Sequence, residues 1–496
     1  MVRSNLALNY STPEAAIQDV EIKDDPLKWC SVSLSDVIAR GSRLDASVYD
    51  TEAIQMRNLI NAGKYSLVPV GGSSGLASGY TCGRFKRIWV KYSDYPIYQP
   101  STMLDIKPKP DGYLSKLTKT NIEALRVHKG QVLLTCSGTI GNVSYVSRTL
   151  DNCIFSHDLL RINSKRDNDA GFIYAYLKTK VGNKMLLTNK YGAVVTHIEA
   201  EHLASVPIPD APISIKDEIN SLIVRSFELR DESNDLLDKA NELLVKELAL
   251  PPIEEFKRHA AYYQKNAPVD TFSVKLSDLD GRLDGSYHVP VVDAIVDHLK
   301  KHAAEVTTVG DPRISKEIIL PGRFKRVYVD EGHGRVFIGG KQLWELDPSN
   351  KKYLSIVHHA DRIKKQLELH ENMTLITCSG TIGKVALVGK HWENWTANQH
   401  IIRVVPASNQ LAGYINVFLS SDYGHELITR YTYGSVVDEI DDNHVSQIAF
   451  PILKNQAVQA EINSLALEAN GKRYQAYQLE QIAIKKMNDE VIYAKK

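Results

Sequence analysis

The sequence predicts an α+β fold with two tandem globular α/β domains, each followed by a long helix. The two helices are expected to pair as an antiparallel coiled coil with pseudo-twofold symmetry. Three observations lead to this prediction: the 496-residue chain repeats itself at a spacing of about 242 residues, each repeat mixes strand-like and helix-like segments, and each repeat ends in a heptad pattern. Solenoid repeats run about 20 to 50 residues, so this longer period indicates a duplicated domain.

The duplication is clearest around a glycine-bearing motif. Residues 133–146 read LLTCSGTIGNVSYV and residues 375–388 read LITCSGTIGKVALV, with ten of fourteen positions identical. Four more matches follow the same order at offsets of 239 to 243: LSD at 34–36 and 276–278, GRFKR at 83–87 and 322–326, YG[AS]VV at 191–195 and 433–437, and EINSL at 218–222 and 461–465. Chance does not explain so many colinear matches.

The elements of each globular part follow from local patterns. Short β-prone runs at 132–136 and 375–378 end at SGTIG, where glycine supplies the backbone freedom of a tight turn, and a second strand-like run follows each turn. This arrangement predicts a strand–turn–strand unit in each copy. Apolar residues at three- and four-residue spacing predict one helix over 171–186 and one over 413–428.

The ends of the two repeats carry the heptads. Leucines recur every seven residues in the first copy beside a row that includes small residues, which predicts a coiled-coil helix of about 30 residues, or ~45 Å. We expect the contact between the helices to involve Leu222, Leu229, Leu236, Leu243, Ile462, Ala469, Ala476 and Leu479. Two separate amphipathic helices, each lying on its own domain, are the alternative.

These patterns divide the chain into six segments. They are an N-terminal arm (1–28), a first globular domain (29–212), a first helix (213–250), a linker (251–270), a second globular domain (271–454) and a second helix (455–496). Pro251 and Pro252 are expected to end the first helix, because proline cannot continue a helical hydrogen-bond ladder.

Composition narrows the class of protein. The formal net charge of +1 excludes a small, globally basic nucleic-acid binder but allows local basic faces. The chain has no apolar stretch long enough for a membrane span and no apolar core of a signal peptide near its start. Its five cysteines are scattered without a CxxC pair, which favours a reducing cytoplasm over a disulfide framework.

Common catalytic motifs are absent. The sequence has no GxxxxGK[ST] phosphate loop, no HExxH metal motif, no GxSxG elbow and no Asn/Asp-Pro-Pro-aromatic motif of amino-group DNA methyltransferases. Cys136 and Cys378 end apolar runs, which predicts buried structural thiols. His157 aligns with Gln399 and His197 aligns with Glu439, an exchange that argues against a catalytic histidine in either place.

The order of these motifs resembles the specificity (S) subunit of type I restriction–modification systems, over nearly the whole chain from about Ser31. The resemblance implies that the globular parts are target recognition domains, each reading one half of a bipartite, asymmetric site in double-stranded DNA. It implies a subunit without catalysis of its own, whose shared helices bind two modification (methyltransferase) subunits and, through them, restriction/translocase subunits. S-adenosylmethionine, ATP and Mg would then belong to the partner subunits, and none would be bound by this chain.

Two alternatives stay open at this point. One is the specificity subunit of a two-subunit type II system, in which the partner fuses methylation and cleavage. The other is a protein-interaction scaffold that does not bind DNA, which the near-zero net charge allows.

Candidate DNA contacts come from two places. The GRFKR repeats put three cations within five residues, a pattern suited to phosphate contacts: Arg84, Lys86, Arg87, Arg323, Lys325 and Arg326. Base contacts are expected where the copies differ, and polar residues that differ at an offset of 240 are Gln99, Ser101, Thr102, Lys341 and Gln342. The alternatives are an ordinary solvated strand edge for the first group and a polar surface loop for the second.

Overall fold

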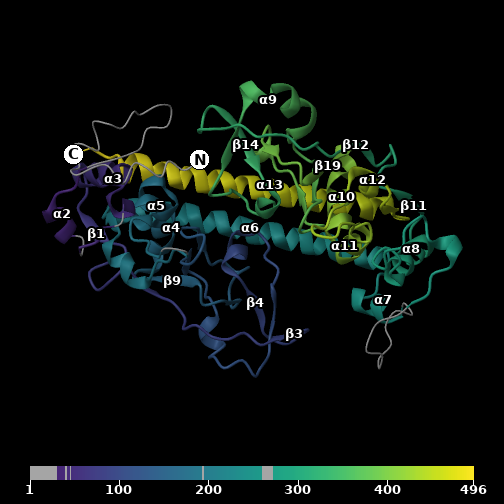
Figure 1. Ribbon diagram of the computed structural model, residues 1–496, viewed down its shortest axis with the longest axis horizontal. Coiled ribbons are helices and arrows are strands. Elements are labelled where there is room, and N and C mark those ends of the chain that lie inside the picture. Colours follow the sequence, from purple (N-terminus) through teal and green to yellow (C-terminus); the bar gives the residue numbers. More distant parts are fainter. Residues whose placement is uncertain (1–30, 40–41, 45, 193–194, 260–271, 496) are drawn as a thin grey trace, which may run out of the picture.

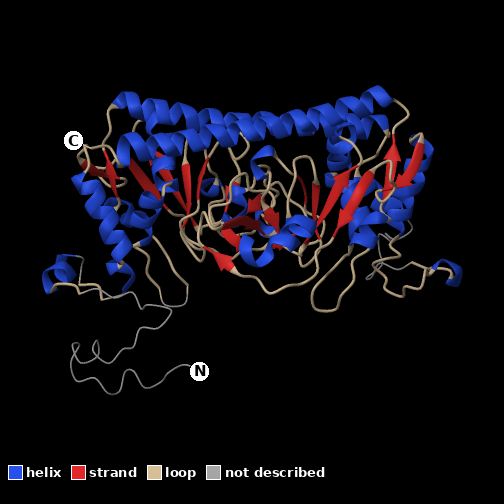
Figure 2. Cartoon of the chain, turned by 90° about the horizontal axis from the view of Figure 1, so that it is seen from above, coloured by secondary structure: helices blue, strands red, loops and turns tan. Residues whose placement is uncertain are grey.

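The computed structural model describes residues 31–39, 42–44, 46–192, 195–259 and 272–495 (Figure 1). They form two domains of mixed α and β structure beneath two long helices that run side by side along one edge of the molecule (Figure 2). The expected fold class is therefore confirmed. The predicted N-terminal arm (1–28) and the part of the predicted linker from 260 to 270 lie outside the described residues.

The first domain contains three sheets in its described part. One four-stranded sheet has the order β2 (Ala77–Tyr80), β9 (Leu159–Ser164), β6 (Val132–Thr135), β7 (Val143–Tyr145). The other has the order β3 (Trp89–Val90), β5 (Gly112–Leu114), β4 (Pro96–Tyr98), β8 (Ile154–Phe155), and a two-stranded sheet joins β1 (Leu67–Pro69) to β10 (Pro207–Pro209). The domain's helices are α2 (Leu34–Ala39), α3 (Thr51–Ala62), α4 (Ala170–Lys178) and α5 (Lys180–Leu187).

The second domain repeats this topology strand for strand. Its sheets have the orders β12 (Ser315–Ile319), β19 (Ile401–Pro406), β16 (Thr374–Thr377), β17 (Val385–Leu387), then β13 (Tyr328–Val329), β15 (Lys352–Ser355), β14 (Gly334–Ile338), β18 (Thr396–Ala397), and finally β11 (Glu305–Thr308) with β20 (Ala449–Ile452). Its helices, with one in the linker, are α7 (Ile253–His259), α8 (Pro290–His302), α9 (Ile356–Arg362), α10 (Asn409–Ser420), α11 (Asp422–Thr429) and α12 (Asp442–Ser446). A half-turn about the viewing direction of Figure 1 brings the lobe around β4 onto the lobe around β14.

The predicted strand–turn–strand units are present. β6 pairs with β7 in antiparallel register, with Leu134 opposite Val143, and β16 pairs with β17 in the same way. Between the strands, Gly138 and Gly380 have φ values of 72° and 75°. This left-handed conformation is accessible to glycine at little cost, which explains the glycine of SGTIG.

The prediction of one helix over 171–186 and one over 413–428 is wrong. Each segment forms two helices, α4 and α5 in the first domain and α10 and α11 in the second. The interruption lies at Thr179 and Ser421, whose extended backbone (ψ of 155° and 161°) turns the chain and whose side chains cap the next helix. A threonine or serine with a glycine three residues later is an N-cap pattern, so the break had a local signal.

The two long helices, α6 (Ile213–Glu247) and α13 (Gln456–Lys486), run antiparallel along each other. Ser226 Oγ donates to the Ala476 carbonyl at 2.7 Å, Lys472 pairs with Glu232 at 2.7 Å, and Lys486 pairs with Glu218 at 3.0 Å. From the first ion pair to the second, the residue number rises by fourteen in α13 and falls by fourteen in α6, as it must in an antiparallel pair. The interpretation of two separate helices is therefore excluded.

Small residues, rather than the leucines, make the closest contact between the helices. Side chains of the two helices that are exposed by 1% or less include Ile219, Ser226, Ser233, Ala240, Ile462, Ala469, Ala476 and Ala483. Leu229 is also buried, whereas Leu222, Leu236, Leu243 and Leu479 are half-buried at the sides of the contact. Small side chains let the two backbones approach closely, and the flanking leucines are left to pack against the domains.

Each helix is tied to its own domain by the asparagine of EINSL. Asn220 Oδ1 accepts from the Gly171 amide and Asn463 Oδ1 accepts from the Gly413 amide, both at 2.8 Å. A Cβ at Gly413 would lie 2.5 Å from the Asn463 carbonyl oxygen, so the approach requires glycine at this position. The motif repeats because it joins domain to helix in both copies.

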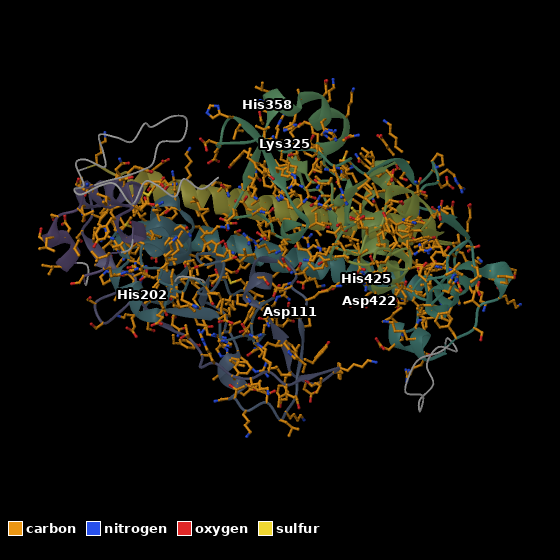
Figure 3. All side chains as sticks on the ribbon, in the orientation of Figure 1. Asp111, His202, Lys325, His358, Asp422 and His425 are labelled. Carbon is orange, nitrogen blue, oxygen red and sulfur yellow. The ribbon has the colours of Figure 1, made fainter. Side chains whose placement is uncertain are left out.

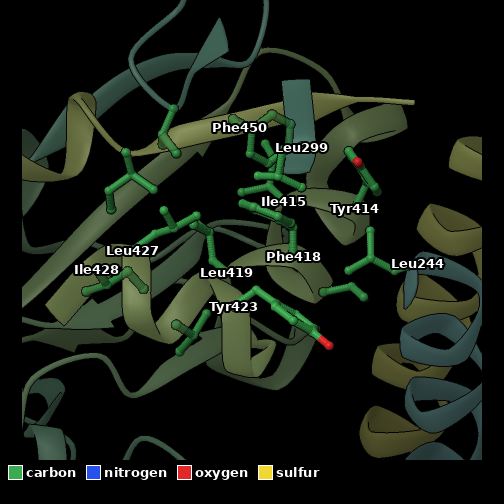
Figure 4. Packing of buried hydrophobic residues seen from close by; sticks show 14 of the residues in the cluster. Leu244, Leu299, Tyr414, Ile415, Phe418, Leu419, Tyr423, Leu427, Ile428 and Phe450 are labelled. Carbon is green, nitrogen blue, oxygen red and sulfur yellow. The ribbon is translucent and has the colours of Figure 1, made fainter. Parts of the chain in front are cut away.

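The end of each long helix packs against the other domain. Leu244 and Leu248 of α6 belong to the core of the second domain, and Figure 4 shows Leu244 facing Tyr414 and Phe418. Met487 and Ile492, at the end of the chain's last helix, belong to the core of the first domain. The helix pair therefore fixes the two domains relative to each other through hydrophobic cores at both ends.

Candidate nucleic-acid interface

The first GRFKR segment presents two of its three cations to solvent. It is an extended segment between β2 and β3, so successive side chains point to opposite sides. Arg84 and Lys86 are exposed, while Phe85 and Arg87 are half-buried, with Arg87 lying 3.8 Å from the carboxylate of Asp158. Arg84 and Lys86 are therefore the two cations of this segment that face solvent.

The second GRFKR segment has the same alternation. Arg323 and Lys325 are exposed, and the half-buried Arg326 donates to Gln399 Oε1 at 2.8 Å. Arg323 reaches Glu439 at 3.3 Å across the surface, a pair that contributes little energy in water. Figure 3 shows Lys325 on the lobe of the second domain, across the helix pair from Asp111 of the first.

The SGTIG turn and the YG[AS]VV segment are joined in both domains. The Gly138 amide donates to the Thr196 carbonyl at 3.1 Å, and the Gly380 amide donates to the Asp438 carbonyl at 2.9 Å. Positions 192 and 434 also require glycine, because a Cβ there would lie 2.2 Å and 2.1 Å from the carbonyl oxygen three residues further on. The SGTIG turn and the YG[AS]VV segment thus form a scaffold shared by both domains, and we call these two motifs the rim.

The rim carries apolar side chains that solvent reaches. Val436 is 94% exposed, and Tyr191, Val195, Tyr433 and Val437 are also exposed. Exposed apolar side chains gathered on one surface indicate an interaction site. In the second domain they lie close to an exposed cation, because Arg323 reaches the carboxylate of Glu439, whose backbone bridges to that of Tyr433. In the first domain the hydrogen bond from the Tyr191 hydroxyl to Glu199 raises the pKa of Tyr191, and Arg84 lowers it less strongly.

Different side chains occupy equivalent places behind the two cation segments. His157 packs edge-on against Phe85 at 5.6 Å between ring centres, and burial lowers its pKa. Its counterpart Gln399 accepts from Arg326, and the amide's nitrogen is 2.9 Å from His400 Nε2. Histidine and glutamine offer different donors and acceptors, so the two domains present unlike polar groups on one backbone frame.

The second group of sequence-predicted contacts lies elsewhere, toward the contact between the domains. Thr102 Oγ1 donates to the Gln99 carbonyl at 2.9 Å, and Gln342 Oε1 accepts from the Gly339 amide at 3.1 Å, so both side chains have intramolecular roles. Ser101 and Lys341 are exposed. Contact of these five residues with DNA stays a prediction.

That contact between domains lies under the middle of the helix pair. Asp105 and Glu345 face each other across an antiparallel bridge, and the Ile106 amide donates to the Trp344 carbonyl at 2.9 Å. These segments are equivalent in the repeat, so the pseudo-twofold axis passes between them. Each domain is thereby held against its copy as well as against the helices.

Sequence reasoning missed a buried arginine that holds each frame together. Arg161 and Arg403 are both 0% exposed and align in the repeat. The Arg161 guanidinium donates to the carbonyls of Leu159, Leu125 and Phe155, joining the two four-stranded sheets of the domain. The signal was available, because both arginines interrupt apolar runs (LLRI and IIRV) at the same offset as SGTIG.

The cysteines are buried as expected. Burial raises the pKa of Cys136 to about 11 and that of Cys378 to about 12, which keeps both thiols protonated and poorly nucleophilic. Over the described ranges, no three His, Cys, Asp or Glu side chains lie close enough together to hold a metal ion. None of the helices in the described part is both long and apolar enough to cross a membrane.

The chain matches several solved structures at low sequence identity, and three of them are described here. A type I restriction–modification system S subunit from M. genitalium is 12% identical to this chain. The match covers 86% of this chain and 96% of that chain, with a TM-score of 0.33. The HsdS subunit from Thermoanaerobacter tengcongensis matches with 12% identity, 84% and 98% coverage and a TM-score of 0.25. A structure describing assembly and conformational transition of the type I R-M system matches with 13% identity, 87% and 98% coverage and a TM-score of 0.26.

Sequence comparison is more direct. No curated protein matches the chain. The family model described as the type I restriction modification DNA specificity domain matches residues 85–242, which include Lys86 and Arg87 of the first cation segment, the SGTIG turn and most of α6. This part of the chain is therefore similar to a type I restriction–modification DNA specificity domain, and the second half of the chain repeats the topology of the first.

Proposed function

We propose that this chain is the DNA-recognition subunit of a type I restriction–modification system. One observation carries the proposal: two domains of identical topology, each with exposed cations beside a shared rim, present different polar side chains at equivalent positions. Phosphate contacts position a protein on DNA, and unlike polar groups read unlike bases. Two such domains suit a target of two different half-sites.

The spacing of the domains supports a split target. The 35 residues of α6 correspond to ~52 Å at 1.5 Å per residue, and one turn of DNA is ~34 Å. Because both helix ends are anchored in hydrophobic cores, the distance between the readers is set by the protein. We infer a bipartite, asymmetric site with an unread gap between its halves.

The chemistry would come from partners. The solvent-facing sides of α6 and α13 are available to two modification subunits, with restriction/translocase subunits joining the assembly through them. S-adenosylmethionine, ATP and Mg would be held by those subunits, and the complex would act in the cytoplasm. This chain is then a non-catalytic subunit that directs methylation and restriction to the sequence it reads.

Methylome sequencing tests the proposal. A strain carrying the chain with its modification partner should methylate one bipartite motif, and deletion of the gene for this chain should abolish that methylation. Exchanging residues 29–212 for the corresponding domain of another specificity subunit should change one half of the motif only. Methylation that persists after deletion, or a motif without two halves, would contradict the proposed function.

The exposed cations give a second test in the reconstituted complex. The logarithm of the binding constant should fall with the logarithm of salt concentration by about 0.9 per phosphate contact. Replacing Arg84 and Lys86 with alanine should reduce that slope by about 2, as should replacing Arg323 and Lys325. Lys300→Ala, an exposed change on α8, is the control, and an unchanged slope in both double variants would remove these residues from the interface.

A further inference from the structure

The pseudo-twofold symmetry creates two spaces between the helix pair and the domains, and they differ greatly in size. Both are lined by equivalent segments of the repeat, Met103–Ile106 with Val143–Tyr145 in one and Leu343–Leu346 with Val385–Leu387 in the other. The first has a volume of about 30 Å³ and the second about 510 Å³. Only the second falls within the range of small-molecule sites, roughly 300 to 1,000 Å³.

Four substitutions between the copies explain the difference. Large or charged side chains that fill the first space are replaced in the second by smaller or uncharged ones: Tyr174 by Asn416, Lys178 by Ser420, Phe227 by Asn470, and Glu480 by Leu237. The backbone frame is the same around both spaces. The second space is therefore open because of its side chains, and a ligand could occupy the volume that the first copy fills with its own atoms.

The second space lacks the carboxylate that Glu480 contributes to the first. In the first space Glu480, which is 1% exposed, lies 2.5 Å from the Arg230 guanidinium and accepts from the Tyr174 hydroxyl at 2.5 Å. The counterpart of Arg230 is Arg473, and no carboxylate of the described residues lies within ion-pair distance of it. Its guanidinium is left with two neutral acceptors, Ser233 Oγ at 3.2 Å and Asn234 Oδ1 at 3.5 Å.

A second polar group in this cavity has a hydrogen-bond donor without any acceptor. Asn416 occupies the place of Tyr174, is 6% exposed, and its side-chain nitrogen has no hydrogen-bond acceptor. In the first copy the groups at these two positions, Tyr174 and Arg230, converge on one carboxylate. A buried donor without a partner is unfavourable, so an acceptor placed here would be favoured.

The cavity wall has an apolar and aromatic part beside charged side chains that include Lys107, Asp238, Glu345 and Asp422. Leu237, Leu343, Trp344 and Trp392 form the apolar part, and both indole N–H groups are satisfied by backbone carbonyls, at 2.9 Å and 3.2 Å. The tryptophans therefore offer ring surface rather than hydrogen bonds. Lys384 lies over the Trp344 ring at 4.3 Å and adds positive charge to the same space.

We propose that this cavity binds a small carboxylic acid with an aromatic body, whose carboxylate pairs with Arg473 and accepts from Asn416. The ring packs against Trp344, Trp392 and Leu237. The ligand supplies in the second copy what Glu480 supplies in the first, and its binding completes the contact between the second domain and the helix pair. Thr381, Ile382 and Gly383 of the SGTIG turn border the cavity, whereas its lining includes none of the GRFKR cations proposed to contact DNA.

Isothermal titration calorimetry with trans-cinnamate, and with cinnamamide as its neutral match, tests the site in the full chain. We expect one cinnamate per chain and at least tenfold weaker binding of cinnamamide. Arg473→Gln should weaken cinnamate binding at least tenfold, and Arg473→Lys should restore part of it. Circular dichroism of each variant checks that the chain is folded.

A matched pair at position 237 supplies an independent arm. Leu237→Glu places an internal carboxylate where Glu480 stands in the other copy, so it should abolish cinnamate binding and raise the melting temperature. Leu237→Gln has nearly the same size without the charge, so it should weaken cinnamate binding through lost apolar contact but leave it measurable, unlike Leu237→Glu. No saturable cinnamate binding, or equal binding in Leu237→Glu and Leu237→Gln, overturns the proposal. If Leu237→Glu instead impairs assembly with the modification subunits while cinnamate does not bind, the occupant is a partner's side chain and the small-molecule site is refuted.

Discussion

At the residue scale, the repeat separates side chains that build the frame from side chains free to act. Within GRFKR, the first two cations face solvent and the third lies against the domain, although the three look alike in the sequence. The buried asparagine of EINSL shows the opposite role, since Asn463 accepts from two backbone amides, of Gly413 and Tyr414, and donates to the Asn409 carbonyl at 3.1 Å. Asn463 is buried, so its side chain serves the fold and is not presented to another molecule.

Asn463→Ala should therefore destabilise the chain without altering its surface. The change leaves buried backbone groups of α10 without partners, which costs about 1–3 kcal/mol. Ser464→Ala, at the exposed next position, should stay within ~0.5 kcal/mol of wild type. Urea unfolding followed by circular dichroism measures both, and equal stability of the two variants would contradict the role assigned to EINSL.

At the element scale, the helix pair depends on small side chains where the backbones are closest. Ser226 donates to the carbonyl of Ala476, and both side chains are completely buried. Glu480 lies one turn further along α13 and neutralises Arg230, so a buried ion pair stands beside the tight contact. Burial alone would raise the pKa of Glu480, yet Arg230, Lys178 and Tyr174 together hold it below its usual range.

Ala476→Leu should disrupt the helix pair by overpacking. Three added carbons have no space between the helices, and strain of this kind costs about 1–3 kcal/mol or more. Gln475→Leu makes the same side chain at the exposed neighbouring position and should be nearly neutral. Thermal unfolding and size-exclusion chromatography check the pair, and a tolerated Ala476→Leu would mean that the helices separate more easily than their packing indicates.

At the scale of the whole molecule, the two domains meet through a pair of acidic residues on the pseudo-twofold axis. Burial raises the pKa of Asp105 to about 7 and that of Glu345 to about 7. The charge of Asp105 raises the pKa of Glu345 further, and the charge of Asp111 raises that of Asp105. Folding therefore favours the protonated forms. The resulting stabilisation is complete below about pH 4 and is lost as the pH rises through about 7.

Asp105→Asn should remove much of this pH dependence. Asparagine resembles the protonated acid, so the melting temperature of the variant relative to wild type should rise as the pH increases from 5 to 8. Asp94→Asn changes an exposed aspartate of the same domain and should show no such trend. Calorimetric scans at pH 5, 6, 7 and 8 measure the difference, and a constant difference across that range would contradict a buried acidic contact between the domains.

The sequence by itself determined the large-scale plan. The offset of about 242 residues, the SGTIG glycines and the heptads predicted two equivalent domains and two long helices, because these signals depend on spacing along the chain. It also identified the GRFKR cations as candidates. It also named Gln99 and Gln342, because they are polar residues at positions that differ between the copies, and their contact with DNA stays a prediction.

Only the tertiary structure decided which side chain does what. The inward turn of Arg87 and Arg326 and the contacts of the frame arginine Arg161 depend on neighbours distant in the chain. The unequal cavities depend on pairs of positions from separate segments that meet only after folding. Periodicity in the sequence indicates which face of an element is apolar. The charge, the space and the hydrogen-bond partners at a site are set by contacts between elements. Those contacts differ between the two halves of this duplicated chain, and therefore the two halves differ in their sites.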